Sequence, residues 1–276
     1  MRFSIVVPSF NQAPFLEQCL AGLLPQVDDD TEVIVVDGGS SDDSLAVIQR
    51  YAPGLAWWVS EPDEGQSDAL NKGLAKARGE WLGWLNSDDL LLPGALATLR
   101  AFVASHPDAR WLAGGGRFID AAGRTLRSYP PPPRPLRAAD LAPWTNSWFG
   151  QPGCIFRRDL FEQAGGEVRS DLHYAMDLDL WLRLGEHAPL QPVPAELGAY
   201  RLHAASKTVD QRAPMEVEVV QVLLERLGPQ AALERVEGLA QERFELEARY
   251  RRLTQDLVSP LGWWRLLRRR LGAPGR

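Results

Sequence analysis

Two adjacent carboxylates follow a short apolar run in this chain. Asp88 and Asp89 come after Asn86 and Ser87, directly behind residues 81–85. Neighbouring carboxylates repel each other, and a divalent cation or a metal-bound phosphate relieves that repulsion. Mg²⁺ and Mn²⁺ take oxygen ligands and often bridge carboxylates to a diphosphate. The cluster therefore predicts a metal–diphosphate site, and the alternative is a set of turn and cap residues ahead of a helix.

A second candidate group lies in residues 177–183, DLDLWLR. On a helix, Asp179 and Arg183 are one turn apart and would form an ion pair. Each residue turns the helix by about 100°, so Asp177 lies about 200° away from Asp179. Asp177 can therefore face a cleft and act as a general base. The alternative is a carboxylate that is only solvated.

The third group is residues 200–208, YRLHAASKT. His203 can complete a Mn²⁺ site begun by Asp88, because imidazole suits this metal. Lys207, with Arg201 nearby, can neutralise a diphosphate. The alternative for His203 is an ordinary surface or core histidine.

Other kinds of site are not indicated. Residues 114–116 are all glycine but match neither the phosphate-binding P-loop nor the dinucleotide fingerprint. The chain has no GxSxG elbow, and its two cysteines, Cys19 and Cys154, are too few for a zinc site. We expect both thiols to be buried in a reducing compartment.

The elements that must position these groups alternate along the first half. Short apolar runs at residues 3–7, 32–36, 55–59 and 81–85 predict strands. Helical spacing follows each of them, at residues 14–23, 43–51, 66–77 and 93–103. This alternation predicts a parallel sheet with right-handed crossovers.

Polar residues come directly after each of the four predicted strands. Ser9 and Phe10 follow the first, Asp37 the second, residues 60–63 the third and residues 86–89 the fourth. Parallel strands bring these turns to one edge of the sheet, where open α/β sheets bind ligands. We therefore expect one crevice to hold them all.

The second half has weaker patterns. Residues 128–137, SYPPPPRPLR, predict a polyproline-like connector, either a rigid surface loop or a wall of an acceptor site. Residues 151–156 predict a strand, and residues 159–163, 174–184 and 216–257 predict helices. We expect a main domain over residues 1–215 and a helical extension over residues 216–276.

The charge and the apolar content of the chain indicate which classes of partner it can bind. A net charge of −6 argues against a nucleic-acid binder. No apolar stretch is long enough to span a membrane, and the N-terminus reads as a strand rather than a signal peptide. Residues 263–276, WWRLLRRRLGAPGR, predict an interfacial helix, although a packed helix or a disordered tail is equally open. We expect a cytoplasmic protein that can bind peripherally to the inner face of the cell membrane.

Together these segments resemble glycosyltransferase family 2, the inverting enzymes with the GT-A fold. The segments that carry the resemblance are SIVVPSFNQAPFLEQCL, EVIVVDGGSSDDS, SEPDEGQSDALNKGLAKARGEWLGWLNSDDLLLPGAL, YAMDLDLWLRL and YRLHAASKT. They cover about residues 3 to 210 in the family's order. The resemblance implies a mostly parallel α/β sheet flanked by helices, and a C-terminal helical extension lies outside it.

The resemblance also implies a nucleotide-sugar pocket. Its implied contacts to base, ribose and diphosphate are Pro8, Ser9, Phe10, Asp37, Asp63, Gln66, Asp68, Asn71 and Lys72. Lys207 belongs to the motif that closes the family's pattern. The donor would be a UDP-, GDP- or dTDP-sugar.

The resemblance assigns the metal and the base as well. Asn86 and Asp88 match the first and third positions of the DXD motif, so Asp88 would bind Mn²⁺ or Mg²⁺. Asp89 would contact the donor sugar or support the metal, and His203 would complete the site. Asp177 matches the catalytic base. Asn86 replaces the usual first aspartate and removes one negative charge.

The implied reaction moves a sugar to an acceptor hydroxyl, with inversion, in surface polysaccharide or glycolipid assembly. The acceptor would be a glycan or a lipid-linked glycan. One alternative is a nucleotide-sugar-binding protein that has lost catalysis. Another is a sugar-phosphate nucleotidyltransferase, but residues 9–15, SFNQAPF, lack the Gly-rich basic signature of that class. Met176 stands where many relatives carry glutamate.

Overall fold

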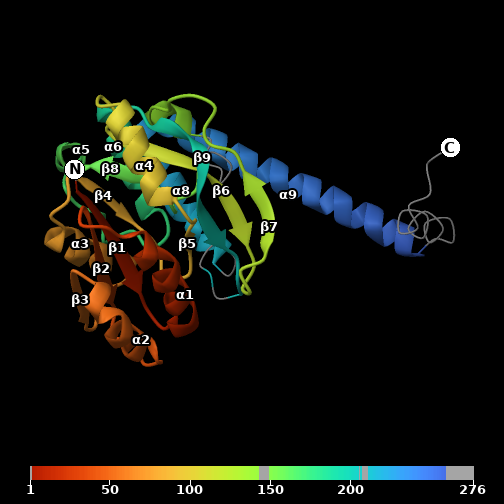
Figure 1. The fold of residues 1–276 in the computed structure, drawn as a ribbon. Helices are drawn as coiled ribbons and strands as arrows, with labels where there is room; N and C mark the ends of the chain where they lie inside the picture. Colours follow the sequence, from red (N-terminus) through yellow and green to blue (C-terminus); the bar gives the residue numbers. More distant parts are fainter. Residues whose placement is uncertain (1, 143–148, 205, 207–210, 259–276) are drawn as a thin grey trace.

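The computed structural model describes residues 2–142, 149–204, 206 and 211–258. One sheet runs through the molecule, with helices on both of its faces (Figure 1). Its strands are β1 (Phe3–Ser9), β2 (Thr31–Asp37), β3 (Trp57–Ser60), β4 (Trp81–Trp84), β5 (Leu90–Leu91), β6 (Trp111–Ile119), β7 (Thr125–Tyr129), β8 (Ile155–Arg157) and β9 (Gln191–Arg201). The α-helices are α1 (Ala13–Leu23), α2 (Ser44–Tyr51), α3 (Gln66–Lys76), α4 (Ala95–Ser105), α5 (Arg158–Gln163), α6 (Met176–His187), α8 (Arg212–Leu227) and α9 (Pro229–Val258). The 3₁₀ turns are η1 (Leu24–Gln26), η2 (Ala52–Gly54) and η3 (Ala138–Leu141).

The N-terminal half confirms the predicted alternation. Strands β3, β2, β1 and β4 lie side by side and run parallel. Ser9 pairs with Asp37 and Asp37 with Ser60, so three strands end at the same level. The turns that follow them therefore open on one edge of the sheet.

The remaining strands make the sheet mixed. Strand β8 runs antiparallel to β4 and β6, whereas β9 runs parallel to β6. The glycines at residues 114–116 lie in β6, which we did not predict as a strand. A Cβ on Gly114 would lie 2.5 Å from the carbonyl oxygen of Ala195, and one on Gly116 would lie 2.3 Å from that of Gly198. These glycines therefore allow β6 and β9 to approach closely through a bulged register.

Two apolar clusters fill the two faces of the sheet. Helices α1, α2 and α4 cover one face with residues such as Leu16, Val47 and Leu96. Helices α3, α5, α6 and α8 contribute to the other, where Trp181 stacks on Trp84 at 5.0 Å between ring centroids. The turns after the parallel strands are thus supported by a core that is packed on both faces of the sheet.

Two helices follow the sheet. Gly228, with a φ of 88°, reverses the chain between α8 and α9. Figure 1 shows α8 against the body and α9 projecting away from it. Among the described helices, none has the length and apolarity that crossing a membrane requires. The predicted basic segment, residues 263–276, lies outside the described residues.

Candidate active site

A cavity of about 550 Å³ opens at the carboxyl ends of the parallel strands. The predicted residues that line it are Pro8, Ser9, Phe10, Asp63, Gln66, Asn86, Asp88, Asp89 and Asp177. They come from the ends of β1, β3 and β4 and from the starts of α3 and α6. The structure therefore brings the turns after the strands to one crevice, as the strand order predicts.

Several predicted residues do not line this cavity. Asp37 is fully buried and accepts hydrogen bonds from the hydroxyls of Ser40 (2.5 Å) and Ser60 (2.7 Å). Asn71 pairs its side-chain amide with the backbone N–H and C=O of Val168. These two residues hold the surrounding backbone in place.

Lys72 and Asp68 pair with each other on α3. The Lys72 Nζ lies 3.2 Å from the Asp68 carboxylate and 3.1 Å from that of Glu61. The hydrogen bond with Glu61 is the largest cause that raises the pKa of Lys72. Both residues lie beside the cavity rather than on its wall. Lys207, the other predicted lysine, is outside the described residues.

The acidic cluster has two different carboxylates. Asp88 is partly exposed, and its Oδ2 lies 3.0 Å from His203 Nε2 and 3.4 Å from Gln12 Nε2. Asp89 is buried and accepts a hydrogen bond of 2.8 Å from the Arg201 backbone N–H. Burial and the neighbouring Asp88 charge raise the pKa of Asp89 well above its usual value. Both carboxylates line the cavity, and Asp88 is the more exposed of the two.

Asp88 and His203 fit a divalent cation. A carboxylate and an imidazole are ligands that Mn²⁺ accepts. In the part of the chain that the structure describes, no group of three or more His, Cys, Asp or Glu side chains could hold a metal. Diphosphate oxygens and water would have to complete the coordination, as they do in many Mg²⁺ and Mn²⁺ sites.

Arg201 binds both residues of the acidic cluster through hydrogen bonds. Its side chain is buried, and its Nε donates a hydrogen bond of 2.6 Å to the Asp88 carbonyl. The guanidinium also lies 4.9 Å from the Phe15 ring centroid. Its Nε, Nη1 and Nη2 all donate to groups of the protein, so Arg201 supports the acidic cluster, and its part in neutralising a diphosphate stays a prediction.

Asp177 stands in the first turn of α6, half-buried on the cavity wall. One carboxylate oxygen accepts a hydrogen bond of 2.7 Å from the Leu178 backbone N–H. The positive end of the helix dipole favours the ionised carboxylate at this position. Asp177 is thus placed to accept a proton from a group in the cavity.

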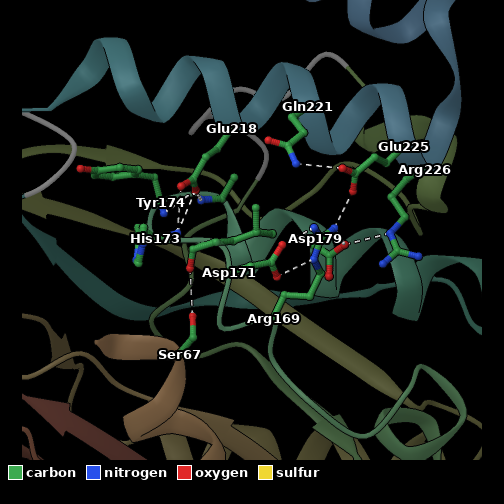
Figure 2. A network of polar contacts seen from close by, with 12 residues as sticks. Ser67, Arg169, Asp171, His173, Tyr174, Asp179, Glu218, Gln221, Glu225 and Arg226 are labelled. Atoms are coloured by element: carbon green, nitrogen blue, oxygen red, sulfur yellow. Dashed lines mark hydrogen bonds and ion pairs between the residues drawn. The ribbon is translucent and has the colours of Figure 1, made fainter. Parts of the chain in front are cut away.

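Asp179, two residues further along the helix, has a structural role. It is fully buried and pairs with Arg183 at 2.8 Å, which confirms the predicted i,i+4 contact. Arg226 of α8 pairs with it at 2.8 Å, and Arg169 lies 3.6 Å away. Figure 2 shows this network joining α8 to α6. The sequence did not indicate Arg169 and Arg226, because both are distant from Asp179 along the chain.

Glu218 of α8 reaches the segment just before α6. Its carboxylate accepts hydrogen bonds from the backbone N–H groups of His173 (3.0 Å), Tyr174 (2.7 Å) and Ala175 (3.0 Å). No cap from the preceding residue is present, since Ala175 has no polar side chain. Glu218 therefore accepts, from another helix, the N–H of the cap residue Ala175 and those of the two residues before it.

The far wall of the cavity is largely aromatic. Its rings belong to Phe118, Tyr129, Phe149, Trp181 and Tyr200. The hydroxyl of Tyr129 and the Oε1 of Gln151 are buried and have no hydrogen-bond partner among the described residues. Burial is the largest cause that raises the pKa of Tyr129.

Part of this wall was not predicted from the sequence. Tyr129 falls in the proline-rich connector, for which a wall was one of two interpretations, and it ends β7. Gln151 starts a segment predicted as a strand, and its Nε2 donates a hydrogen bond of 2.6 Å to the Trp84 carbonyl. Gln12 lies in the same turn as Ser9 and Phe10, so its position after the first strand was a usable signal. Its Oε1 accepts a hydrogen bond of 2.5 Å from the Ser87 hydroxyl.

The sequence of this chain is similar to those of known glycosyltransferases. Residues 4–165 match the model of the family described as glycosyl transferase family 2. An uncharacterised protein of Mycobacterium tuberculosis (strain CDC 1551 / Oshkosh) is 35% identical over 74% of this chain and 68% of its own length. A PGL/p-HBAD biosynthesis glycosyltransferase of Mycobacterium bovis (strain BCG / Pasteur 1173P2) is 38% identical over 38% of this chain and 42% of its own length.

Solved structures agree in fold. The crystal structure of S. aureus TarS 1–349 in complex with UDP-GlcNAc has a TM-score of 0.66 at 18% identity, over 82% of this chain and 67% of that one. The mannosyltransferase PcManGT from Pyrobaculum calidifontis, in complex with GDP-Man and Mn²⁺, has a TM-score of 0.57 at 19% identity. That match covers 95% of this chain and 82% of the other.

Proposed function

The chain belongs to glycosyl transferase family 2 and has the GT-A fold, and from this premise we propose that it is a metal-dependent, inverting glycosyltransferase. It would move one sugar from a nucleotide-sugar to an acceptor hydroxyl. One observation carries this proposal. Asp88 and Asp177 come from distant parts of the chain and line the same cavity, and His203 contacts Asp88.

Asp177 acts as the general base in this reaction. Its carboxylate takes the proton of the acceptor hydroxyl while the oxygen forms a bond to the anomeric carbon. The bond from that carbon to the nucleotide diphosphate breaks, and the diphosphate leaves with the electron pair. Attack on the face opposite the leaving group inverts the anomeric centre.

Asp88 and His203 would hold the divalent metal, either Mn²⁺ or Mg²⁺. When bound, such a cation offsets the negative charge that the departing diphosphate gains. Arg201 keeps Asp88 in place through its bond to the Asp88 carbonyl. Asn86 is held in turn by Gln66, whose Nε2 donates to the Asn86 Oδ1 at 2.8 Å.

The remaining wall fits a nucleotide and a sugar. The Phe10 ring is 60% exposed and offers a stacking surface for a base. The hydroxyl of Tyr129 and the side-chain Oε1 of Gln151, which have no partner in the part of the chain that the structure describes, would gain partners from sugar hydroxyls. Asp37, Asp63, Asp68, Asn71, Lys72 and Lys207 remain proposed donor contacts, direct or through the backbone they hold.

Similar proteins suggest the substrates. Solved structures with this fold are complexes with UDP-GlcNAc, UDP and GDP-Man, so we propose a UDP-, GDP- or dTDP-sugar donor. The relatives named for PGL biosynthesis favour a glycan or lipid-linked acceptor. Residues 1–215 would form the transferase domain and residues 216–276 an extension whose basic tail docks on the cytoplasmic membrane face.

A donor panel tests the proposal. UDP-glucose, UDP-GlcNAc, GDP-mannose and dTDP-glucose are added to the protein with Mn²⁺ or with EDTA, and thermal stability and donor hydrolysis are measured. We expect one donor to raise Tm and to be hydrolysed slowly, and both effects to disappear with EDTA. Metal-independent hydrolysis, or none with any donor, would contradict the proposal.

A further inference from the structure

Helix α8 lies beyond the residues that the family model matches, yet it reaches the cavity. Met215 and Val219 on α8 line the cavity beside Tyr174 and Met176. Figure 2 shows α8 lying across the segment that leads into α6, with Glu218 pointing toward His173 and Tyr174. One face of α8 is therefore part of the wall that stands next to Asp177.

Glu218 lies between the two cavity residues of α8 and binds the backbone next to the base. Its carboxylate takes three consecutive backbone N–H groups, those of residues 173–175. Hydrogen bonds to a charged acceptor are about twice as strong as neutral ones. Asp177 follows only two residues after the last of these donors.

We infer that Glu218 is a positioning residue for the catalytic base, an inference that rests on the proposed role of Asp177. The carboxylate fixes the backbone at the start of α6 and thereby fixes where the Asp177 side chain stands. Without it, three N–H groups lose their acceptor and the first helical turn loosens. A misplacement of about 1 Å can cost about 100-fold in rate, so a small shift matters.

A second contact supports this arrangement. The Tyr174 hydroxyl donates a hydrogen bond to the Gln211 side chain, at the start of α8. The turn before Asp177 is thus tied to α8 at two points. The rest of α6 is held separately, because Asp179 pairs with Arg183 and Arg226 further along. Loss of Glu218 should therefore disturb the first turn and leave the helix folded.

Glu225 provides a matched control on the same helix. Its carboxylate pairs with Arg169 at 2.6 Å, in the same connecting segment, but it does not line the cavity. Glu225→Ala removes a carboxylate of the same kind from α8 without touching residues 173–175. General weakening of the α8 contact would affect both variants alike.

The test uses the full chain with Mn²⁺ and the donor identified in the panel, with water as the acceptor. We expect Glu218→Ala to lower kcat about 10- to 100-fold with the donor KM unchanged. Glu218→Gln keeps one acceptor oxygen, so its kcat should lie between those of wild type and Glu218→Ala. The kcat of Glu225→Ala should stay within about 2-fold of wild type. Hydrogen exchange at the amides of residues 173–175 should speed up in Glu218→Ala only.

Two results overturn the inference. One is unchanged exchange at residues 173–175 in Glu218→Ala, and this readout does not depend on turnover. The other is an equal loss of kcat in Glu218→Ala and Glu225→Ala. If Asp177→Asn is inactive in the same assay, only the inference about Glu218 has failed. If Asp177→Asn keeps wild-type turnover, the assignment of Asp177 as the base and that of Glu218 as its positioning residue are both wrong.

Discussion

A single carboxylate carries the proton transfer in the proposed reaction. Asp177→Asn keeps the size of the side chain but removes its basicity. Because a general base contributes about 10²–10⁴-fold, we expect turnover to fall by about that factor. The donor site is built from other residues, so the Tm shift with donor and Mn²⁺ should persist. Turnover close to that of wild type in Asp177→Asn would show that another group takes the proton.

The buried hydroxyl of Tyr129 allows a test of sugar binding. It has no partner among the described residues, so Tyr129→Phe should leave Tm unchanged or raise it slightly. If a sugar hydroxyl uses this group, kcat/KM should fall about 5- to 10-fold, which corresponds to about 1 kcal/mol. Steady-state kinetics with donor and acceptor varied separately show which sugar is bound. Unchanged kinetics would remove Tyr129 from the site.

Residue types alone identified the residues that could act, but not how they are arranged. Asp88 and Asp177 follow from acidic positions after a strand and on a helix, and His203 from its place in a motif. The sequence could not show that Arg201 turns inward, because its partner is the backbone carbonyl of Asp88. Glu218 was hidden for the same reason, since it binds backbone N–H groups that have no sequence signature.

At the scale of elements, Glu32 connects β2 to β1 and to the segment before β4. It accepts hydrogen bonds from the Ser4 hydroxyl (2.6 Å) on β1 and from the Arg78 Nε (3.1 Å) before β4. Burial alone would raise the pKa of Glu32, but the hydrogen bonds from Ser4 and Arg78 outweigh it and lower the pKa. A lowered carboxyl pKa stabilises the fold above the usual value of 4.5, and this contribution is lost as pH falls through the folded pKa.

We therefore expect Glu32→Gln to lower the free energy of unfolding by about 1.5–3 kcal/mol at pH 7. As pH falls below 4.5 and through the lowered folded pKa, the difference from wild type should shrink, since wild type loses the charge there. Urea denaturation across this range measures both effects. Glu17→Gln, which removes an exposed partner of Arg50, should cost less than about 1 kcal/mol. A difference that grows on acidification would contradict the assignment.

Strands were predictable from the sequence where every residue of the strand is buried and the apolar run is continuous. The residues of β1 and β2 are all buried, and their apolar runs marked them as strands. Strands β6 and β9 were missed, because residues 114–116 are glycine and β9 contains Pro192 and Pro194. Both features normally argue against a central strand. Here the glycines permit the close approach of the two strands, which only the tertiary structure reveals.

The whole molecule has a body and a projecting helix. Partly buried Arg235 pairs with Glu216 at 2.5 Å, and Arg212 with Glu242 at 2.6 Å, so the first half of α9 is fastened to α8. Beyond Glu242, Phe244 and Leu246 are 69% and 68% exposed. Arg243 and Arg251 both pair with Glu247, which lies on the same helix.

Ending the chain after Glu242 should therefore leave the body intact. We expect Tm to change by no more than about 2 °C and turnover of the donor to be unchanged, as for most surface changes. Co-sedimentation with phosphatidylglycerol vesicles should fall, because the basic tail at residues 263–276 is lost with the helix end. Phosphatidylcholine vesicles serve as the control. Undiminished co-sedimentation of the shortened chain would assign membrane binding to the body. No co-sedimentation of the full chain would exclude membrane binding by the tail.

The projecting half of α9 also works as a lever. From Arg243 to Val258 it extends about 24 Å at 1.5 Å per residue. A rotation of α8 by about 10° would carry this far end sideways by about 4 Å, whereas atoms near the axis of α8 would barely move. A pair of spin labels, one near Val258 and one on the body, would magnify motions of α8 that are too small to see at the cavity.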